Sequence, residues 1–136
     1  MPKLDHVAVQ VSDIEASIAF YTEKLGFKLL FHRQDLSHHE AFAFLEMEGG
    51  NLELLQVLDD DGKPAPFVAP EVVPPYCPHL AVQSNDLDAD IRLLEEHDIP
   101  LLKGPLEISG SVRWLYFCDP DNNVLEYVHW LEGKGS

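Results

Sequence analysis

The sequence lacks the features that would place the protein in a membrane or in an oxidising compartment. It contains no run of about 18 apolar residues, so we expect no transmembrane segment. The first three residues lead straight into strand-like sequence, without the apolar stretch of a signal peptide. Its two cysteines, Cys77 and Cys118, are too few for a disulfide framework. A reduced, cytoplasmic setting is therefore expected.

Basic residues are also scarce. Nine lysines and arginines stand against 24 aspartates and glutamates, which gives a formal net charge of −15. Such a charge repels phosphate backbones and anionic lipids, so neither nucleic acid nor a membrane surface is expected as a partner. The sequence also lacks a P-loop, a dinucleotide-binding fingerprint and a Gly-x-Ser-x-Gly nucleophile motif. These absences disfavour the common nucleotide-dependent and serine-hydrolase classes.

What the sequence does contain is an internal repeat. Residues 78–91 align with residues 5–18 after a shift of 73 positions, with seven identities in the 13 positions from His6 to Ile18. His79 thereby matches His6, and the same gapless shift places Glu126 on Glu53. Self-similarity over most of a chain indicates two copies of one structural unit. A histidine and a glutamate therefore occupy equivalent places in two modules.

Each module has the pattern of a strand, a helix and three further strands. In the first module, Ser12 and Glu15 have the form of a capping box, and Gly26 is a typical helix stop. Asp-Pro-Asp-Asn-Asn at 119–123 is turn sequence in the second. The expected strands cover residues 6–11, 27–33, 41–47 and 51–58, then 78–84, 100–103, 112–118 and 124–131, and the expected helices cover residues 14–25 and 87–96.

The domain organisation follows from this order. Module 1 covers about residues 4–58, a proline-rich linker covers residues 59–77, and module 2 covers about residues 78–131. Either module alone would be a small sheet with one uncovered apolar face. We therefore expect the two to pack as one α+β domain over residues 1–136.

The repeated residues suit a metal. Imidazole nitrogen and carboxylate oxygen together bind divalent first-row metals such as nickel, cobalt, zinc, iron or manganese. Because side chains alternate along strands, a histidine at a strand start and a glutamate in mid-strand can point into one concavity. His6, Glu53, His79 and Glu126 would supply four ligands and leave two positions open. A packed histidine or a salt-bridged glutamate is the structural alternative, and the shared offset of both residue types favours the metal.

Other histidines fit a site less well. His38 and His39 precede a strand and are expected in a solvated loop. His129 follows Glu126 by three residues along one strand, so its side chain is expected on the opposite face.

The motifs resemble those of a known family. They are Asp-His-Val-Ala-Val at 5–9, Phe-Tyr-x-x-x-Leu-Gly-Phe at 20–27, Pro-His-Leu-Ala-Val at 78–82 and Phe-Cys-Asp-Pro-Asp-Asn-Asn-Val-Leu-Glu at 117–126. Over nearly its whole length the chain resembles the vicinal oxygen chelate superfamily, which includes glyoxalase I, methylmalonyl-CoA epimerase, extradiol dioxygenases and antibiotic-resistance proteins. The resemblance implies two β-α-β-β-β modules that form one curved, mixed eight-stranded sheet around a metal.

The resemblance also implies an activity. A complete set of two histidines and two glutamates is most similar to glyoxalase I, a metal-dependent lyase, and to the epimerase. It implies a small substrate with adjacent oxygens, proton abstraction next to a carbonyl through a metal-stabilised enediolate, Glu126 as the base and Glu53 as its counterpart. A homodimer is expected, with the site built either within one chain or across the dimer.

Two residues differ from the glyoxalase I pattern, and two other protein classes are alternatives. Small bacterial glyoxalase I proteins have an arginine and an asparagine for glutathione where this chain has Gln10 and Val57, so a different thiol carrier is expected. One alternative is a drug-binding, resistance-type protein without catalysis, for which the negative charge and the aromatic residues Phe42, Phe44, Trp114 and Tyr116 would suit a flat or cationic ligand. The other is an extradiol-type dioxygenase.

Overall fold

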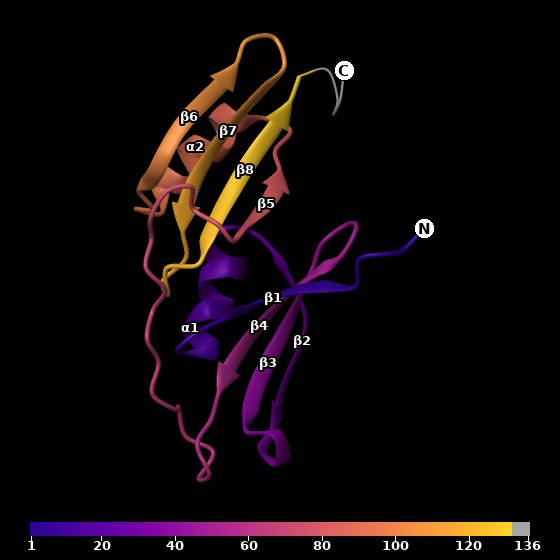
Figure 1. The fold of residues 1–136 in the computed structure, drawn as a ribbon, viewed down its shortest axis with the longest axis vertical. Coiled ribbons are helices and arrows are strands. Elements are labelled where there is room, and N and C mark those ends of the chain that lie inside the picture. Colours follow the sequence, from indigo (N-terminus) through magenta and orange to yellow (C-terminus); the bar gives the residue numbers. More distant parts are fainter. Residues whose placement is uncertain (132–136) are drawn as a thin grey trace. The chain divides into compact units, whose positions relative to one another are not determined.

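The computed structural model describes residues 1–131, and the chain divides into two compact units at residues 70 and 71. Each described unit contains four strands and one principal helix, and their course can be followed in Figure 1. The predicted α+β fold with two β-α-β-β-β modules is confirmed. The eight strands form two four-stranded mixed sheets, one in each unit. No helix within residues 1–131 is long and apolar enough to cross a membrane.

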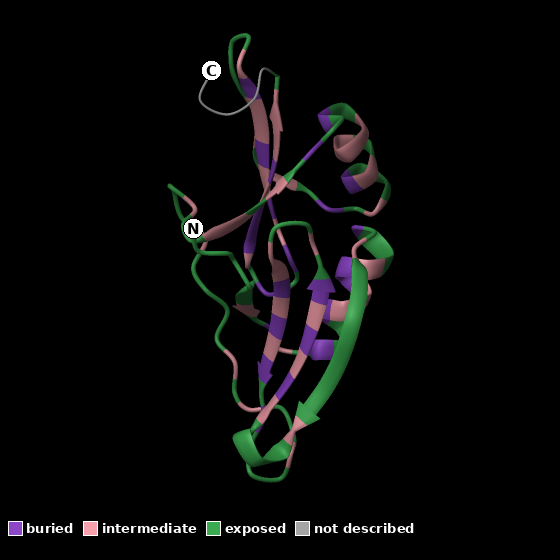
Figure 2. Ribbon diagram, turned by 90° about the vertical axis from the view of Figure 1, so that its right-hand side faces the viewer, coloured by how far each residue is buried: buried purple, intermediate pink, exposed green. Residues whose placement is uncertain are grey.

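The sheet of the first unit has the strand order β1-β4-β3-β2. Strand β1 (His6–Gln10) runs parallel to β4 (Asn51–Val57), while β3 (Glu40–Glu46) is antiparallel to β4 and to β2 (Lys28–Asp35). Buried residues alternate along β3 and β4, as the banding in Figure 2 shows, and helix α1 (Ile14–Ala19) packs against these strands. The alternate residues of the two strands lie on the face that α1 does not cover.

The start of α1 differs from the prediction. The N-cap is Asp13, not Ser12: its backbone is extended and its carboxylate accepts hydrogen bonds from the amides of Glu15 and Ala16. The buried side chain of Gln56 completes the cap, since its Oε1 accepts from the Ile14 amide and its Nε2 donates to the Ser12 carbonyl, both at 2.9 Å. A partner more than forty residues away leaves no local pattern in the sequence.

The end of this helix also has an irregular geometry. The chain continues from α1 as a π-helical turn, η1 (Phe20–Lys24), in which the Leu25 amide donates to the Phe20 carbonyl. Gly26 then ends the helix with a φ of +76°, as predicted for a left-handed stop. The wider turn places Tyr21 completely inside the unit, with an exposed fraction of 0%.

The second unit repeats this arrangement with the order β5-β8-β7-β6. Its elements are β5 (His79–Gln83), α2 (Leu87–Glu96), β6 (Leu101–Ile108), β7 (Val112–Cys118) and β8 (Val124–Trp130). Strand β6 is longer than the predicted 100–103, because it is an edge strand that tolerates Pro105. Its pairing with β7 shifts register between Lys103 and Leu106.

Two aspartates organise turns, one at the start of the predicted linker and one at the predicted turn of residues 119–123. Asp59 begins the segment between β4 and β5, where its Oδ1 accepts from the amides of Asp61 and Lys63 at 2.9 Å. Asp119 does the same between β7 and β8, where its Oδ1 accepts from the amides of Asp121 and Asn123. Both turns form by side-chain capping of the backbone, which is the role expected of aspartate at such positions.

Candidate functional site

In the first unit, His6 and Glu53 project from adjacent parallel strands on the face that α1 leaves uncovered. The register pairs His6 with Asn51 and Ala8 with Glu53, so the two side chains are neighbours along one face. His6 Nε2 lies 3.5 Å from Glu53 Oε1. The ring of Phe44 borders the pair, with its centroid 5.2 Å from that of the imidazole.

The other nitrogen of His6 is held by its neighbour in sequence. His6 Nδ1 lies 2.6 Å from Asp5 Oδ2. This hydrogen bond raises the pKa of His6; burial works against it, and the charge of Glu53 adds to it. Asp5 thereby fixes the ring so that Nε2 points toward Glu53.

Glu53 is mostly enclosed, with 14% of its side chain exposed. Burial raises the pKa of this carboxyl group above its ordinary value, while the charge of His6 lowers it and that of Glu40 raises it. A carboxylate in such surroundings is stabilised by a nearby cation.

The second unit contains an equivalent pair. His79 pairs with Val124 and Ala81 with Glu126, at the same offsets as in the first unit. His79 Nε2 lies 2.8 Å from Glu126 Oε1, and 13% of the Glu126 side chain is exposed. The Tyr116 ring contacts the imidazole edge-on, with the centroids 5.2 Å apart.

A backbone oxygen holds the second nitrogen of His79. Its Nδ1 lies 3.0 Å from the Tyr76 carbonyl, at the end of the linker. The proline-rich segment therefore contributes to the orientation of the ring. Neither of these two hydrogen-bond partners was predicted from the sequence. Asp5 could have been predicted as a partner of the imidazole, because it directly precedes His6, whereas nothing in the sequence points to the Tyr76 carbonyl.

The four predicted residues are thus brought together as two pairs. Within residues 1–131, no group of three or more histidine, cysteine, aspartate or glutamate side chains forms a ready-made metal cluster. Each pair offers one imidazole nitrogen and one carboxylate oxygen, the donor types of first-row metals. The four-residue set stays a prediction.

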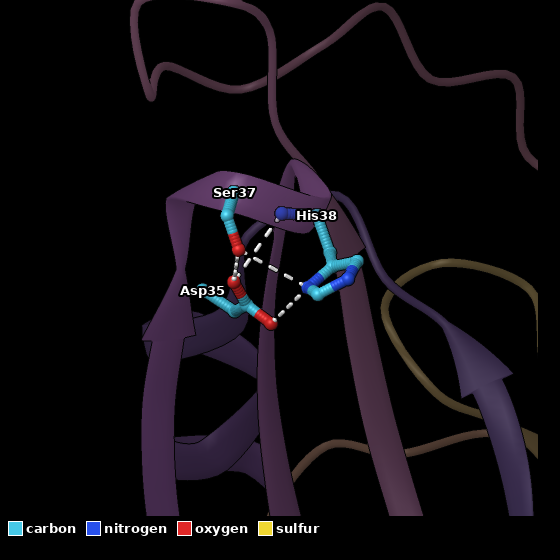
Figure 3. A network of polar contacts seen from close by, with 3 residues as sticks. All are labelled: Asp35, Ser37 and His38. Carbon is cyan, nitrogen blue, oxygen red and sulfur yellow. Dashed lines mark hydrogen bonds and ion pairs between the residues drawn. The ribbon is translucent and has the colours of Figure 1, made fainter.

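The histidines that were set aside lie elsewhere. His38 is exposed in a short 3-10 turn, η2 (Leu36–His38), where Figure 3 shows Asp35 bonded to Ser37 and His38. His129 lies on the opposite face of β8 from Glu126, as predicted, and its Nδ1 lies 2.9 Å from the Ser84 carbonyl.

The two β-α-β-β-β modules, each with one histidine–glutamate pair, are the features of the superfamily that the sequence motifs resemble. A comparison with family models agrees with this assignment. The chain belongs to the Glyoxalase/Bleomycin resistance protein/Dioxygenase superfamily, whose family model matches residues 3–127. The matched range includes most of both modules and the four predicted residues His6, Glu53, His79 and Glu126.

Relatives with assigned names are distant. The chain is 28% identical to virulence protein STM3117 of Salmonella typhimurium, covering 95% of this chain and 85% of that protein. It is 25% identical to bovine mitochondrial methylmalonyl-CoA epimerase, covering 88% of this chain and 68% of that protein. It is also 25% identical to lactoylglutathione lyase of Schizosaccharomyces pombe, covering 97% of this chain but 49% of that protein.

Solved structures agree with the fold. SMU.1112c superposes with a TM-score of 0.79 at 24% identity, covering 94% of this chain and 98% of that one. TnmS3, an antibiotic-binding protein from Streptomyces sp. CB03234, superposes with a TM-score of 0.69 at 25% identity, covering 96% and 97%. The superfamily therefore includes both enzymes and a binding protein among the relatives of this chain.

Proposed function

We propose that the protein is a metal-dependent lyase or isomerase of the glyoxalase or epimerase type. One observation carries the proposal: in both units the histidine has Nδ1 held by an oxygen and Nε2 directed at a glutamate. Histidines that bind metals are oriented in this way, with the second ring nitrogen bonded to a carboxylate or a carbonyl.

The residues also fit a divalent ion by their chemistry. His6, Glu53, His79 and Glu126 supply two nitrogen and two oxygen donors, a mixed set that suits nickel, cobalt, zinc, iron or manganese. The raised pKa of Glu53 reflects a carboxylate with little solvent, which a cation would stabilise. We propose these four side chains as the metal ligands.

When bound, such an ion would draw electron density from two neighbouring oxygens of the substrate and so acidify the adjacent carbon. Glu126 would accept the proton from that carbon as the C–H electron pair moves into a carbon–carbon double bond. In an isomerisation Glu126 would then return the proton to the neighbouring carbon, and in an epimerisation Glu53 would deliver a proton to the opposite face of the same carbon. Glu53 would act as its counterpart on the other side of the substrate.

The substrate is proposed as a small molecule with adjacent oxygens. The similarity to an epimerase named for methylmalonyl-CoA and to a lactoylglutathione lyase supports this class. Gln10 and Val57 replace the residues expected for glutathione, so we propose that glutathione is not the preferred carrier. Turnover of methylglyoxal with glutathione should then be weak beside that of other thiol adducts or acyl-CoA thioesters.

Metal content tests the proposal directly. The purified protein should bind about one divalent ion per chain, and His79→Ala should lower that content sharply. His32→Ala is the control, because His32 is an exposed residue of the edge strand β2. Metal retained in full by the His79 variant would refute the ligand assignment.

A second function is supported by the similarity to TnmS3 and by the aromatic side chains beside the first pair. Phe31 stacks on Phe44 with the centroids 5.0 Å apart, next to His6. A protein that only sequesters a flat ligand would bind it without converting it. Proton exchange at the substrate carbon distinguishes the two functions, because binding alone leaves that proton in place.

Assembly and location are also proposed. We propose a single domain that forms a homodimer, in which the ligands come either from one chain or from both. Cys77 and Cys118 are free thiols, which supports a reduced, cytoplasmic setting.

A further inference from the structure

Asp5 is a residue that the two modules do not share. The shift of 73 residues that places His79 on His6 places Pro78 on Asp5. Of the two histidines proposed as ligands, only His6 therefore directly follows a carboxylate. Its Nδ1 lies 2.6 Å from Asp5 Oδ2, a contact that proline cannot make in the second unit.

The backbone of Asp5 is held in place where the chain enters β1. The Asp5 carbonyl oxygen accepts a hydrogen bond from the Asn51 amide at 2.9 Å. The preceding residue, Leu4, packs so closely on Gly50 that a Cβ added there would lie 2.7 Å from the Leu4 side chain. The Asp5 side chain itself is 87% exposed, so replacing it opens no cavity in the core.

The imidazole of His6 lies between two carboxylates at unequal distances. Asp5 Oδ2 is 2.6 Å from Nδ1, whereas Glu53 Oε1 is 3.5 Å from Nε2. Hydrogen bonds from nitrogen to oxygen usually span about 2.7–3.2 Å, so the contact with Asp5 is the stronger one. A neutral imidazole carries one proton, and the nitrogen that donates the hydrogen bond keeps it. The distances therefore favour a proton on Nδ1 and a lone pair on Nε2.

The second histidine has no such bias. His79 Nε2 lies 2.8 Å from Glu126 Oε1, and its Nδ1 lies 3.0 Å from the Tyr76 carbonyl oxygen. The Cys77 sulfur lies 3.8 Å from the same Nδ1. Both ring nitrogens are thus within hydrogen-bonding distance of an oxygen, and distance does not select one of them for the proton. The same two residue types are prepared differently in the two units.

We propose that Asp5 is a positioning residue for the metal site: it keeps the single proton of the neutral His6 ring on Nδ1, so that the Nε2 lone pair is open to a divalent ion before the ion arrives. This inference rests on the proposed function in taking the ligand to be a metal ion. Without Asp5, the ring would donate from Nε2 to Glu53, and the nitrogen that the ion needs would be occupied. A carboxylate behind a metal-binding histidine also makes the ring a stronger donor.

The position of the proton is measured in the metal-free protein, with a chelator present, at about pH 9, well above the ordinary imidazole pKa of about 6.5. A long-range proton–nitrogen-15 NMR spectrum distinguishes Nδ1–H from Nε2–H, and His6→Gln and His79→Gln identify the two rings. Wild-type His6 should be the Nδ1–H form. Asp5→Ala should move much of the proton to Nε2, and Asp5→Asn, which keeps an acceptor oxygen, should largely restore Nδ1–H. The His79 ring should respond to neither substitution.

Zinc affinity, measured by competition with a coloured chelator, is the second readout. Asp5→Ala should bind zinc about 10- to 100-fold more weakly, which is the usual loss when the partner behind a metal-binding histidine is removed. Asp5→Asn should lie between this variant and the wild type. Glu48→Gln is the control, because it also removes one negative charge from an exposed residue of the first unit, and it should bind zinc like the wild type.

Three results would each overturn the inference: an Nε2–H ring in wild-type His6, a proton position that does not respond to Asp5→Ala, or equal zinc affinity in Asp5→Ala and Glu48→Gln. A wild-type protein that binds none of the candidate metals would instead refute the proposed function. The metal-free spectrum would still decide whether Asp5 holds the proton, so the two failures are distinguishable.

Discussion

The two glutamates occupy equivalent positions but have different neighbours. Burial dominates the environment of Glu53, and Glu40 adds a second negative charge. Glu126 contacts His79 more closely, at 2.8 Å against 3.5 Å for Glu53 and His6, and it lines a groove over β7 and β8 together with Trp114 and Tyr116. Glu126 is the base proposed from the sequence, and variants at the two glutamates test that proposal.

Glu126→Gln should therefore remove chemistry more than it removes metal. Glutamine keeps the shape and one oxygen, but its amide does not accept a proton near neutral pH. Loss of a general base costs about 10²- to 10⁴-fold in rate. Proton exchange at the substrate carbon and metal content, measured together, check this expectation.

Glu53→Gln is the matched comparison and should have the milder effect on exchange. Near-normal exchange in Glu126→Gln at full metal content would place the base elsewhere. An equal loss in both variants would mean that both carboxylates carry protons.

Asp35 offers a second test at the residue scale, away from the site. Hydrogen bonds from Ser37, then from His38, hold the pKa of Asp35 below its ordinary value (Figure 3). A carboxyl group whose folded pKa is lowered contributes stability above its unfolded pKa and loses it as pH falls through the folded pKa. Ser37→Ala should thus raise the Asp35 pKa toward the ordinary value, measured by carbon-13 NMR titration of the side chain.

The control for Asp35 is Ser37→Thr, which keeps the hydroxyl group. If alanine and threonine variants titrate alike, the hydroxyl does not stabilise the carboxylate.

Sequence reasoning at this scale succeeded where a rule of strand geometry applied. Alternation along strands, together with the 73-residue offset, predicted that His6 would meet Glu53 and that His79 would meet Glu126. It could not predict the Tyr76 carbonyl behind His79, because that contact depends on the path of an irregular linker. Ring orientation is fixed by such contacts and not by periodicity.

At the scale of elements, the close approach of the β6 and β7 backbones explains why one position of β6 is a glycine. Gly104 lies in β6 with a φ of +108°, and an added Cβ would stand 3.0 Å from both the Leu115 Cα and the Trp114 carbonyl oxygen. Gly110 has a φ of +73° with open space around it. Both positions have a positive φ, which is unfavourable for any residue with a Cβ. Only at Gly104 would the added Cβ also clash with neighbouring backbone.

Gly104→Ala should therefore destabilise the protein more than Gly110→Ala does. Positive φ alone costs an alanine about 1–2 kcal/mol, and the contact with β7 backbone at Gly104 adds to this. Urea unfolding of the two variants gives the difference. Equal losses would show that β6 moves aside at little cost.

The elements themselves were predicted well where local signals were strong and less well at their ends. Helix α2 and strand β7 match the expected bounds. The start of α1 was misassigned because the Gln56 side chain, from β4, completes the cap. Strand β6 was cut short because a proline inside a strand usually indicates its end, and only its place at the edge of the sheet permits it to continue.

For the whole molecule, the duplication raises the question of which chain supplies each half of the site. Each unit carries one complete histidine–glutamate pair, so defects in the two halves can be placed on separate chains. If the site is built across a dimer, mixing His6→Ala with His79→Ala chains should restore one complete site in each mixed dimer. If it is built within one chain, no mixture should recover metal.

This complementation is measured by refolding the two variants together and determining bound metal and exchange activity. The control is each variant refolded alone, which should stay inactive under both arrangements. Recovery of about half of the wild-type sites per mixed dimer supports the shared site. Activity in either variant alone would contradict the assignment of its histidine.

The parallel pairing of β1 with β4 has a consequence for how the chain acquires its shape during synthesis. Strand β1 leaves the ribosome first, yet its partner β4 begins more than forty residues later. Closing such a loop is costly in chain entropy, and non-local pairings form late. The hairpin of β3 and β4 can assemble locally, so we expect the carboxylate of Glu53 to be in place before the imidazole of His6 arrives. We expect the same for β5 and β8, with the histidine of each unit docking as the closing event of folding.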